Sequence, residues 1–153
     1  MNQPQSNRYR NYCRGLIGVV GVGLMSAIVP VFFPVDLMAT IHQWLGVGGE
    51  LGDFPNAPIT IYLARSTSLL YAMHGAVMFY VAWHFDRCQL LVPLLGWLHV
   101  MLGTFMIGVD LNAGMPFYWV AGEGLPIALT GGAILWLFRR SSSNNSGQSS
   151  DAQ

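Results

Sequence analysis

Hydrophobic residues in this chain gather in four long runs separated by shorter polar breaks. Each run has about the 20 residues that a helix needs to cross the roughly 30 Å hydrocarbon core of a membrane. The second run is interrupted by Arg65 and His74. The pattern predicts an all-α membrane protein, an antiparallel bundle of four transmembrane helices. The runs are Gly15–Phe33, Ile59–Phe85, Leu90–Val109 and Trp119–Phe138.

The connection between the first two runs has an amphipathic pattern of its own. Asp36 can cap a short helix that has Trp44, an amphipathic residue typical of the membrane interface, on its apolar side with Leu37, Ile41 and Leu45. We therefore expect a short interfacial helix in the first outer loop. The following VGGELGDFPNAP is a loop by composition, and we interpret it as a lid or spacer rather than a substrate-binding loop.

The two ends of the chain are polar. The first run is too long for a typical signal-peptide core, and no A-x-A-like site follows it, so we expect an uncleaved span. The tail is mostly Ser, Asn, Gln and Gly, a composition that cannot bury a core. The predicted organisation is an N-terminal segment over 1–14, a transmembrane domain over 15–140 and a disordered tail over 141–153.

The charge pattern predicts the orientation. All the arginines outside the runs fall on one side of the predicted bundle, whereas the loops on the opposite side carry acidic residues and no arginine. By the positive-inside rule, both termini are expected in the cytoplasm, with the protein in the cell (inner) membrane. The six arginines are Arg8, Arg10, Arg14, Arg87, Arg139 and Arg140.

Composition agrees with a membrane class and excludes others. Hydrophobic residues make up 53% of the chain and charged residues 9%, against roughly a quarter charged in soluble domains. The formal net charge is zero, so no basic surface for nucleic acid is expected. Cys13 and Cys88 have no metal or redox spacing, and we expect no disulfide between them.

Three charged residues lie in or next to the apolar runs near the outer side. Arg65 is about two helical turns into the second run, Asp110 ends the third, and Glu123 is near the start of the fourth. They can meet at one level, where a cation between two carboxylates would be partly neutralised. We favour a clamp that sets helix register. The alternative is an outward-facing site for an ion, a proton or an anionic substrate.

Two histidines form a second candidate site. His74 and His99 fall near the middle of neighbouring runs, and Tyr71 lies on the same face as His74. On the third run, helical spacing puts His99 on one face with Gly96, Gly103, Met106 and Asp110. They could hold haem or quinone, or relay protons. The alternative is that each histidine bonds a backbone carbonyl or a hydroxyl on the next helix. No cofactor and no metal is predicted, and haem and quinone stay alternatives at this site.

Recognisable catalytic motifs are missing from the sequence. There is no G-x-S-x-G, H-E-x-x-H or Walker sequence. The Gly114-Met115-Pro116 turn and the aromatic residues after it are typical of an interfacial belt. An enzymatic role is not favoured.

Three motifs carry a family resemblance: LARSTSLLYAMHGAV in the second run, GVDLNAG at the end of the third and GEGLP at the start of the fourth. With them the chain resembles small four-helix bacterial inner-membrane proteins of the DoxX-like and related groups, over residues 59–140. The resemblance implies a four-helix fold with Arg65, Asp110 and Glu123 at one face. It implies little about activity.

Three functions follow as hypotheses. The first is a non-enzymatic protein, structural or accessory to a membrane complex, with the lipid bilayer and a membrane-protein partner or a second copy around it. The second is a small transporter or channel that uses the three charges. The third is a redox subunit that holds haem or quinone near His74 and His99.

Overall fold

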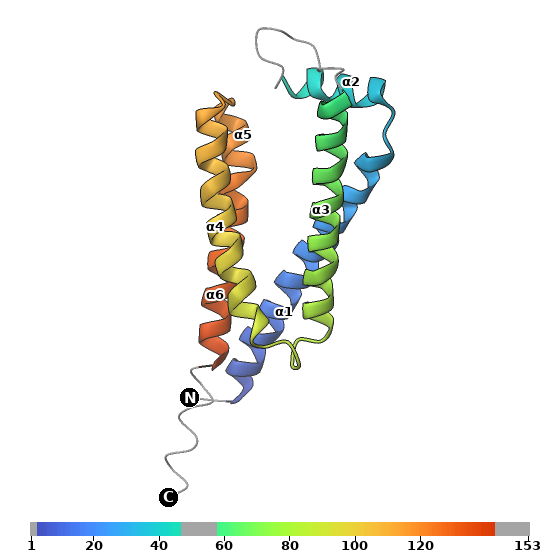
Figure 1. Cartoon of the computed structure of the whole chain (residues 1–153). Helices are drawn as coiled ribbons and strands as arrows, with labels where there is room; N and C mark the ends of the chain where they lie inside the picture. The colour runs from blue at the N-terminus through green and yellow to red at the C-terminus, as the bar shows by residue number, and fades with distance from the viewer. Residues whose placement is uncertain (1–2, 47–57, 143–153) are drawn as a thin grey trace, which may run out of the picture. The chain divides into compact units, whose positions relative to one another are not determined.

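The computed structural model describes residues 3–46 and 58–142, and every regular element in this part of the chain is helical. The predicted loop over 47–57 and the tail from 143 onward lie outside the described residues, as do residues 1–2. The elements are α1 (Gln3–Met25), the 3₁₀ helix η1 (Ser26–Phe32), α2 (Val35–Leu45), α3 (Pro58–Trp83), α4 (Leu91–Asn112), α5 (Phe117–Gly122) and α6 (Gly124–Ser142) (Figure 1).

Three helical stretches of the described chain are long and apolar enough to cross a membrane: Asn7–Phe32, Leu91–Asn112 and Phe117–Ser142. Only 11%, 28% and 22% of the residues in their most apolar segments are buried within the protein. So much exposed apolar surface requires a non-aqueous surrounding, which makes this a membrane protein. The predicted second run is also confirmed as a helix, α3. Because α3 carries Arg65, the polar run 66–68 and His74, it is outside this apolar set, and its crossing stays a prediction.

The chain forms two compact units. The terminal unit contains the described residues 3–19 and 78–142, and the middle unit contains residues 20–46 and 58–77. Helices α1 and α3 each contribute one part to the terminal unit and the other to the middle unit. We describe the units separately.

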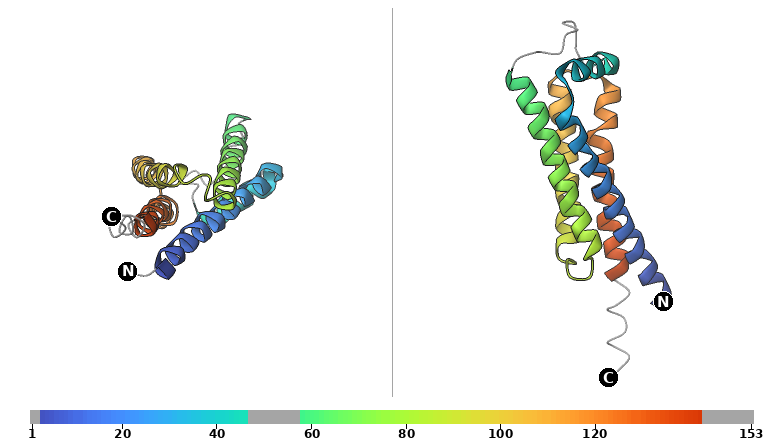
Figure 2. Two further views of the ribbon diagram at one scale, coloured as in Figure 1. Left: turned by 90° about the horizontal axis from the view of Figure 1, so that it is seen from below. Right: turned by 90° about the vertical axis from the view of Figure 1, so that its right-hand side faces the viewer.

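The terminal unit is built on α4 and α6, which pack side by side in opposite directions (Figures 1 and 2). The beginning of α1 packs on the end of α6. The Cys13 thiol lies 3.8 Å from the Ile134 carbonyl oxygen, and the rings of Tyr9 and Trp136 meet edge to face at 5.9 Å. Cys13 and Cys88 are both free thiols, as predicted.

The turn after α4 is a Schellman motif, and Gly114 is its central residue. Gly114 has a φ of +70°, a left-handed conformation that glycine adopts without the steric cost of a Cβ atom. The Gly114 amide donates to the Leu111 carbonyl at 3.2 Å, and the Met115 amide donates to the Asp110 carbonyl at 2.9 Å. These two bonds satisfy carbonyls that the helix end would otherwise leave unpaired. The predicted turn at this point is confirmed.

The predicted fourth run is divided into two helices. It begins at Phe117 instead of Trp119, and Glu123 separates α5 from α6 with a φ of −106° and a ψ of −71°. The cause is Pro126, which has no amide hydrogen for the Gly122 carbonyl and whose ring crowds that carbonyl. At the other end, α6 runs to Ser142, so the first two residues of the predicted tail are helical.

Proline also shapes the middle unit. Pro30 cannot donate to the Ser26 carbonyl, and there the α1 helix tightens into η1. The predicted short helix after Pro34 is confirmed as α2, but Pro34 takes the capping position predicted for Asp36. Asp36 is instead in the first turn, where its negative charge interacts favourably with the helix dipole. The Trp44 side chain is 84% exposed.

Candidate polar sites and the glycine seam

The residues predicted as sites are divided between the two units. His99, Asp110 and Glu123 belong to the terminal unit, and Arg65, Tyr71 and His74 belong to the middle unit. The predicted charge cluster and the predicted histidine pair each draw on both units. The assembly of either group therefore stays a prediction, and the surroundings of each residue are given within its own unit.

The closest helix contact in the terminal unit is a glycine seam, which we define as Gly96 and Gly103 of α4 with Gly124 and Gly131 of α6. A Cβ atom at Gly103 would meet the Ala128 amide nitrogen and would lie 2.5 Å from the Gly124 carbonyl oxygen. A Cβ atom at Gly124 would in turn lie 2.9 Å from the Gly103 carbonyl oxygen. At this pair the two backbones touch directly.

The second pair of the seam is Gly96 with Gly131. A Cβ atom at Gly131 would lie 2.5 Å from the Gly96 carbonyl oxygen, whereas one at Gly96 would lie 3.3 Å from the Gly131 carbonyl oxygen and 2.7 Å from the Leu135 side chain. Small residues that let backbones approach closely are typical of helix interfaces in membranes. The seam therefore holds α4 and α6 together by backbone contact.

Sequence analysis did not identify the α6 half of this seam. It placed five residues on one face of the third run, of which Met106 is half-buried and the other four are buried: Gly96, His99, Gly103 and Asp110. The available signal was spacing. Two glycines seven residues apart occur in each helix, and seven residues are about two turns of one face.

His99 lies within the seam. It is 3% exposed, and its Nδ1 lies 2.8 Å from the Leu95 carbonyl oxygen one turn earlier on the same helix. Because a carbonyl only accepts, Nδ1 carries the proton in this contact. A backbone carbonyl was one of the predicted partners for a histidine, although on the neighbouring helix rather than on its own.

Asp110 is the most deeply buried acidic residue described, at 5% exposed. It stands in the last turn of α4, where the helix dipole disfavours a negative charge. Within residues 3–46 and 58–142, its Oδ2 atom has no hydrogen-bond partner. A buried carboxylate in this position favours a cation beside it. Glu123 is half-buried at the break between α5 and α6.

Arg65 binds a carbonyl in its own unit. Its Nη2 donates to the Phe33 carbonyl oxygen at 3.2 Å, just past the end of η1, whereas its Nε has no hydrogen-bond partner in the part of the chain that the structure describes. A cation at a helix C-terminus is favourable for the dipole and for the carbonyls there. Arg65 therefore ties α3 to the segment after η1.

The other two candidates of the middle unit, Tyr71 and His74, are half-buried on α3. The next residue, Gly75, is a close-contact point. A Cβ atom there would lie 2.5 Å from the Met25 amide nitrogen and 2.6 Å from the Gly21 carbonyl oxygen. The backbones of α3 and α1 therefore approach each other closely at Gly75 and Gly21.

An ion pair in the terminal unit was not predicted. The Nη1 atom of Arg10 in α1 lies 3.2 Å from the Oδ1 atom of Asp86 in the turn after α3. Both side chains are exposed. Sequence analysis assigned Arg10 to the cytoplasmic side but named no partner for it. Among the described residues, no three His, Cys, Asp or Glu side chains gather as a metal site.

Comparisons with known proteins give no relative for this chain. No family model, no curated protein and no solved structure matches it.

Proposed function

We propose that this protein is a four-helix integral membrane protein of the inner membrane, non-enzymatic, and structural or accessory to a membrane complex. The observation that carries this proposal is the apolar surface of the three membrane-length stretches. Little of that surface is buried within the protein. Lipid and a partner helix are the two surroundings that can cover such a surface. The architecture is that of the small DoxX-like proteins that the chain's motifs resemble.

Helix α3 is proposed as the fourth crossing. Its 26 residues give it a length of about 39 Å, more than the hydrocarbon core requires. Large apolar side chains are exposed from its beginning to its end, among them Ile59, Leu70 and Trp83. The polar side chain of Arg65 bonds a carbonyl in the protein, which lowers the cost of placing it in the membrane. Four crossings put both termini on the arginine-rich cytoplasmic side.

Reporter fusions test the topology. With four crossings, alkaline phosphatase is inactive and green fluorescent protein is fluorescent when either is fused after residue 142. With three crossings, the N- and C-termini lie on opposite sides. Fusions at both ends of the same chain therefore distinguish the two topologies, and opposite signals at the two ends overturn the proposed fourth crossing.

The accessory role is tested by the size of the complex. Protein extracted from native membranes in mild detergent should migrate in a native gel well above one 16.8 kDa chain with its micelle. Cross-linking inside the membrane before extraction should retain that size. A single species the size of one chain under both conditions would contradict the accessory role.

Asp110 supports a second candidate function, a small transporter or channel for a cation or proton. The supporting observation is its buried Oδ2 atom without a hydrogen-bond partner among the described residues, at a helix end that disfavours negative charge. Vesicles that contain the purified protein and a pH- or Na⁺-sensitive dye measure the flux. Asp110→Asn should abolish the flux, whereas the exposed Asp86→Asn should retain it. Equal flux in both variants would reject this candidate.

A further inference from the structure

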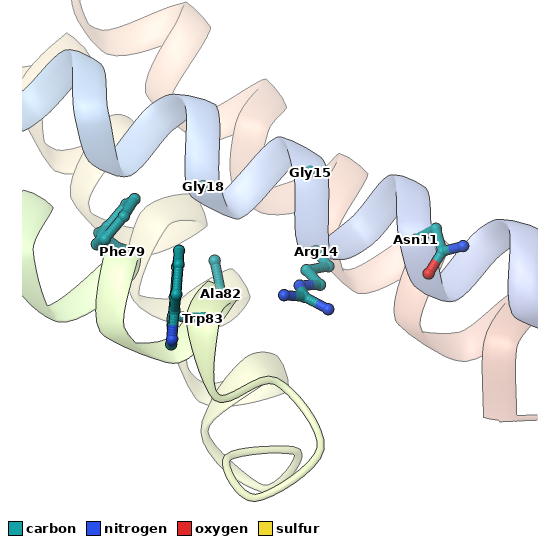
Figure 3. Close-up of a pocket in the computed structure, with 7 residues that line it drawn as sticks. All are labelled: Asn11, Arg14, Gly15, Gly18, Phe79, Ala82 and Trp83. Atoms are coloured by element: carbon teal, nitrogen blue, oxygen red, sulfur yellow. The ribbon is translucent and has the colours of Figure 1, made fainter.

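A groove of about 340 Å³ lies in the terminal unit between the beginning of α1 and the end of α3 (Figure 3). Figure 3 shows the Arg14 side chain extending from α1 on the side where Ala82 and Trp83 lie. The groove combines one positive charge with glycine and aromatic surface. Its lining residues are Asn11, Arg14, Gly15, Gly18, Phe79, Ala82 and Trp83.

Arg14 provides a positive charge that no residue in the described part of the chain neutralises. In the described chain it forms no hydrogen bond and no ion pair, whereas Arg10, one turn earlier, is paired with Asp86 at 3.2 Å. Arg14 is also the last charged residue before the uncharged remainder of α1 and η1. Its guanidinium group therefore stands where the helix passes from water into hydrocarbon, the depth of lipid phosphate groups.

The rest of the groove is open and apolar. A Cβ atom at Gly15 would meet nothing within 4 Å, and one at Gly18 would only reach ordinary contact with Ala82 at 3.5 Å. The Trp83 side chain is 66% exposed at the edge of the groove. Tryptophan is enriched at the level of lipid headgroups. The groove thus has a cationic end and an apolar floor, as a phospholipid requires.

We propose that this groove binds an anionic glycerophospholipid, with the phosphate at Arg14 and the glycerol and first acyl carbons over Gly15 and Gly18. This proposal rests on the proposed membrane architecture. A partner helix would have to bring a carboxylate to Arg14, whereas lipid phosphates are already present at that depth.

Native mass spectrometry of the full-length protein in detergent tests the proposal. The protein is titrated with phosphatidylglycerol or phosphatidylcholine that carry the same acyl chains. We expect the wild type to prefer phosphatidylglycerol and Arg14→Gln to lower that affinity about five- to tenfold. Gly15→Leu fills the groove and should lower the affinity for both lipids.

Two matched variants serve as controls. Arg139→Gln removes an exposed arginine outside the groove, and Gly132→Leu adds a side chain where a Cβ atom meets nothing within 4 Å. Both should bind phosphatidylglycerol within about twofold of the wild type, because neither residue lines the groove. Circular dichroism checks that all four variants retain the wild-type helix content.

Three results would overturn the proposal. The first is equal binding of the two lipids by the wild type, and the second is an effect of Arg14→Gln no larger than that of Arg139→Gln. The third is displacement of the lipid by inorganic phosphate, which would show an ion site instead of a lipid site.

Carbonate washing of membranes tests the architecture separately. Protein that stays in the pellet retains the architecture whatever the lipid result, whereas protein that washes off overturns the membrane assignment.

Discussion

Glycine has opposite roles in two regions of the terminal unit. In the glycine seam, the space beside each glycine is filled by the facing helix, and a Cβ atom at Gly103 would collide with its backbone. In the groove, the space beside Gly15 is empty, and a Cβ atom would meet nothing within 4 Å. The same residue type thus brings two helices into contact in one region and leaves a helix face open in the other.

The difference shows where the stability of this unit lies. Between helices in lipid there is no hydrophobic driving force, so association depends on close packing and on hydrogen bonds. The seam provides that packing through two glycine pairs, Gly96 with Gly131 and Gly103 with Gly124. The groove provides no such contact, and its residues remain available to a ligand.

Gly103→Ala should have the largest effect on stability. The added methyl group would collide with backbone atoms of α6, which cannot move away as a side chain can. We expect a loss of about 1–3 kcal/mol in the free energy of unfolding. Thermal or SDS-induced unfolding of the purified protein, followed by circular dichroism, measures it.

The control for this variant is Gly108→Ala on the same helix, where a Cβ atom meets nothing within 4 Å. Alanine is the better helix former there, so stability should be unchanged or slightly higher. Gly131→Ala and Gly132→Ala form a second matched pair on α6, and only the first should be destabilising. Equal stability within either pair would contradict the close approach of α4 and α6.

His99→Leu should have an intermediate effect. Leucine is similar in size but loses the hydrogen bond of Nδ1 to the Leu95 carbonyl, whose net contribution is about 0.5–1.5 kcal/mol. The same unfolding measurement applies, with Leu98→Ala as a control on an exposed face of α4. A loss much above this range would indicate that His99 also supports a contact outside the seam.

Arg10→Gln should have a smaller effect. The pair with Asp86 is largely exposed, and such pairs contribute about 0.2–1 kcal/mol. High salt should remove most of the difference from the wild type because it screens exposed charges. A difference that persists unchanged in 1 M salt would show that the pair is more protected from water than this structure indicates.

Gly15→Ala should have the smallest effect on stability. The methyl group enters open space in the groove, and we expect a change within about 0.5 kcal/mol. A destabilisation as large as that of Gly103→Ala would contradict the contrast between the seam and the groove, because it would show that a neighbour already occupies the space beside Gly15.

The candidate sites were predictable from the sequence only in part. The depth of Asp110 follows from its place at the end of an apolar run, and its burial agrees with the predicted shared face with His99. The Arg65 contact with the Phe33 carbonyl was not predictable, because it depends on how η1 ends beside α3. The ion pair of Arg10 with Asp86 joins residues 76 positions apart, and local sequence patterns do not predict such a contact.

The sequence by itself determined the helical segments, although not all of their ends, since α1 begins at Gln3 and the predicted first run at Gly15. Apolar runs of membrane length define the helices, and Pro30, Gly114 and Pro126 act through their own backbone geometry on residues at most four positions away. Tertiary structure alone decided which glycines form the seam and which leave an open groove. That distinction depends on which helix faces each glycine, and the volumes of side chains distant in the sequence set that arrangement.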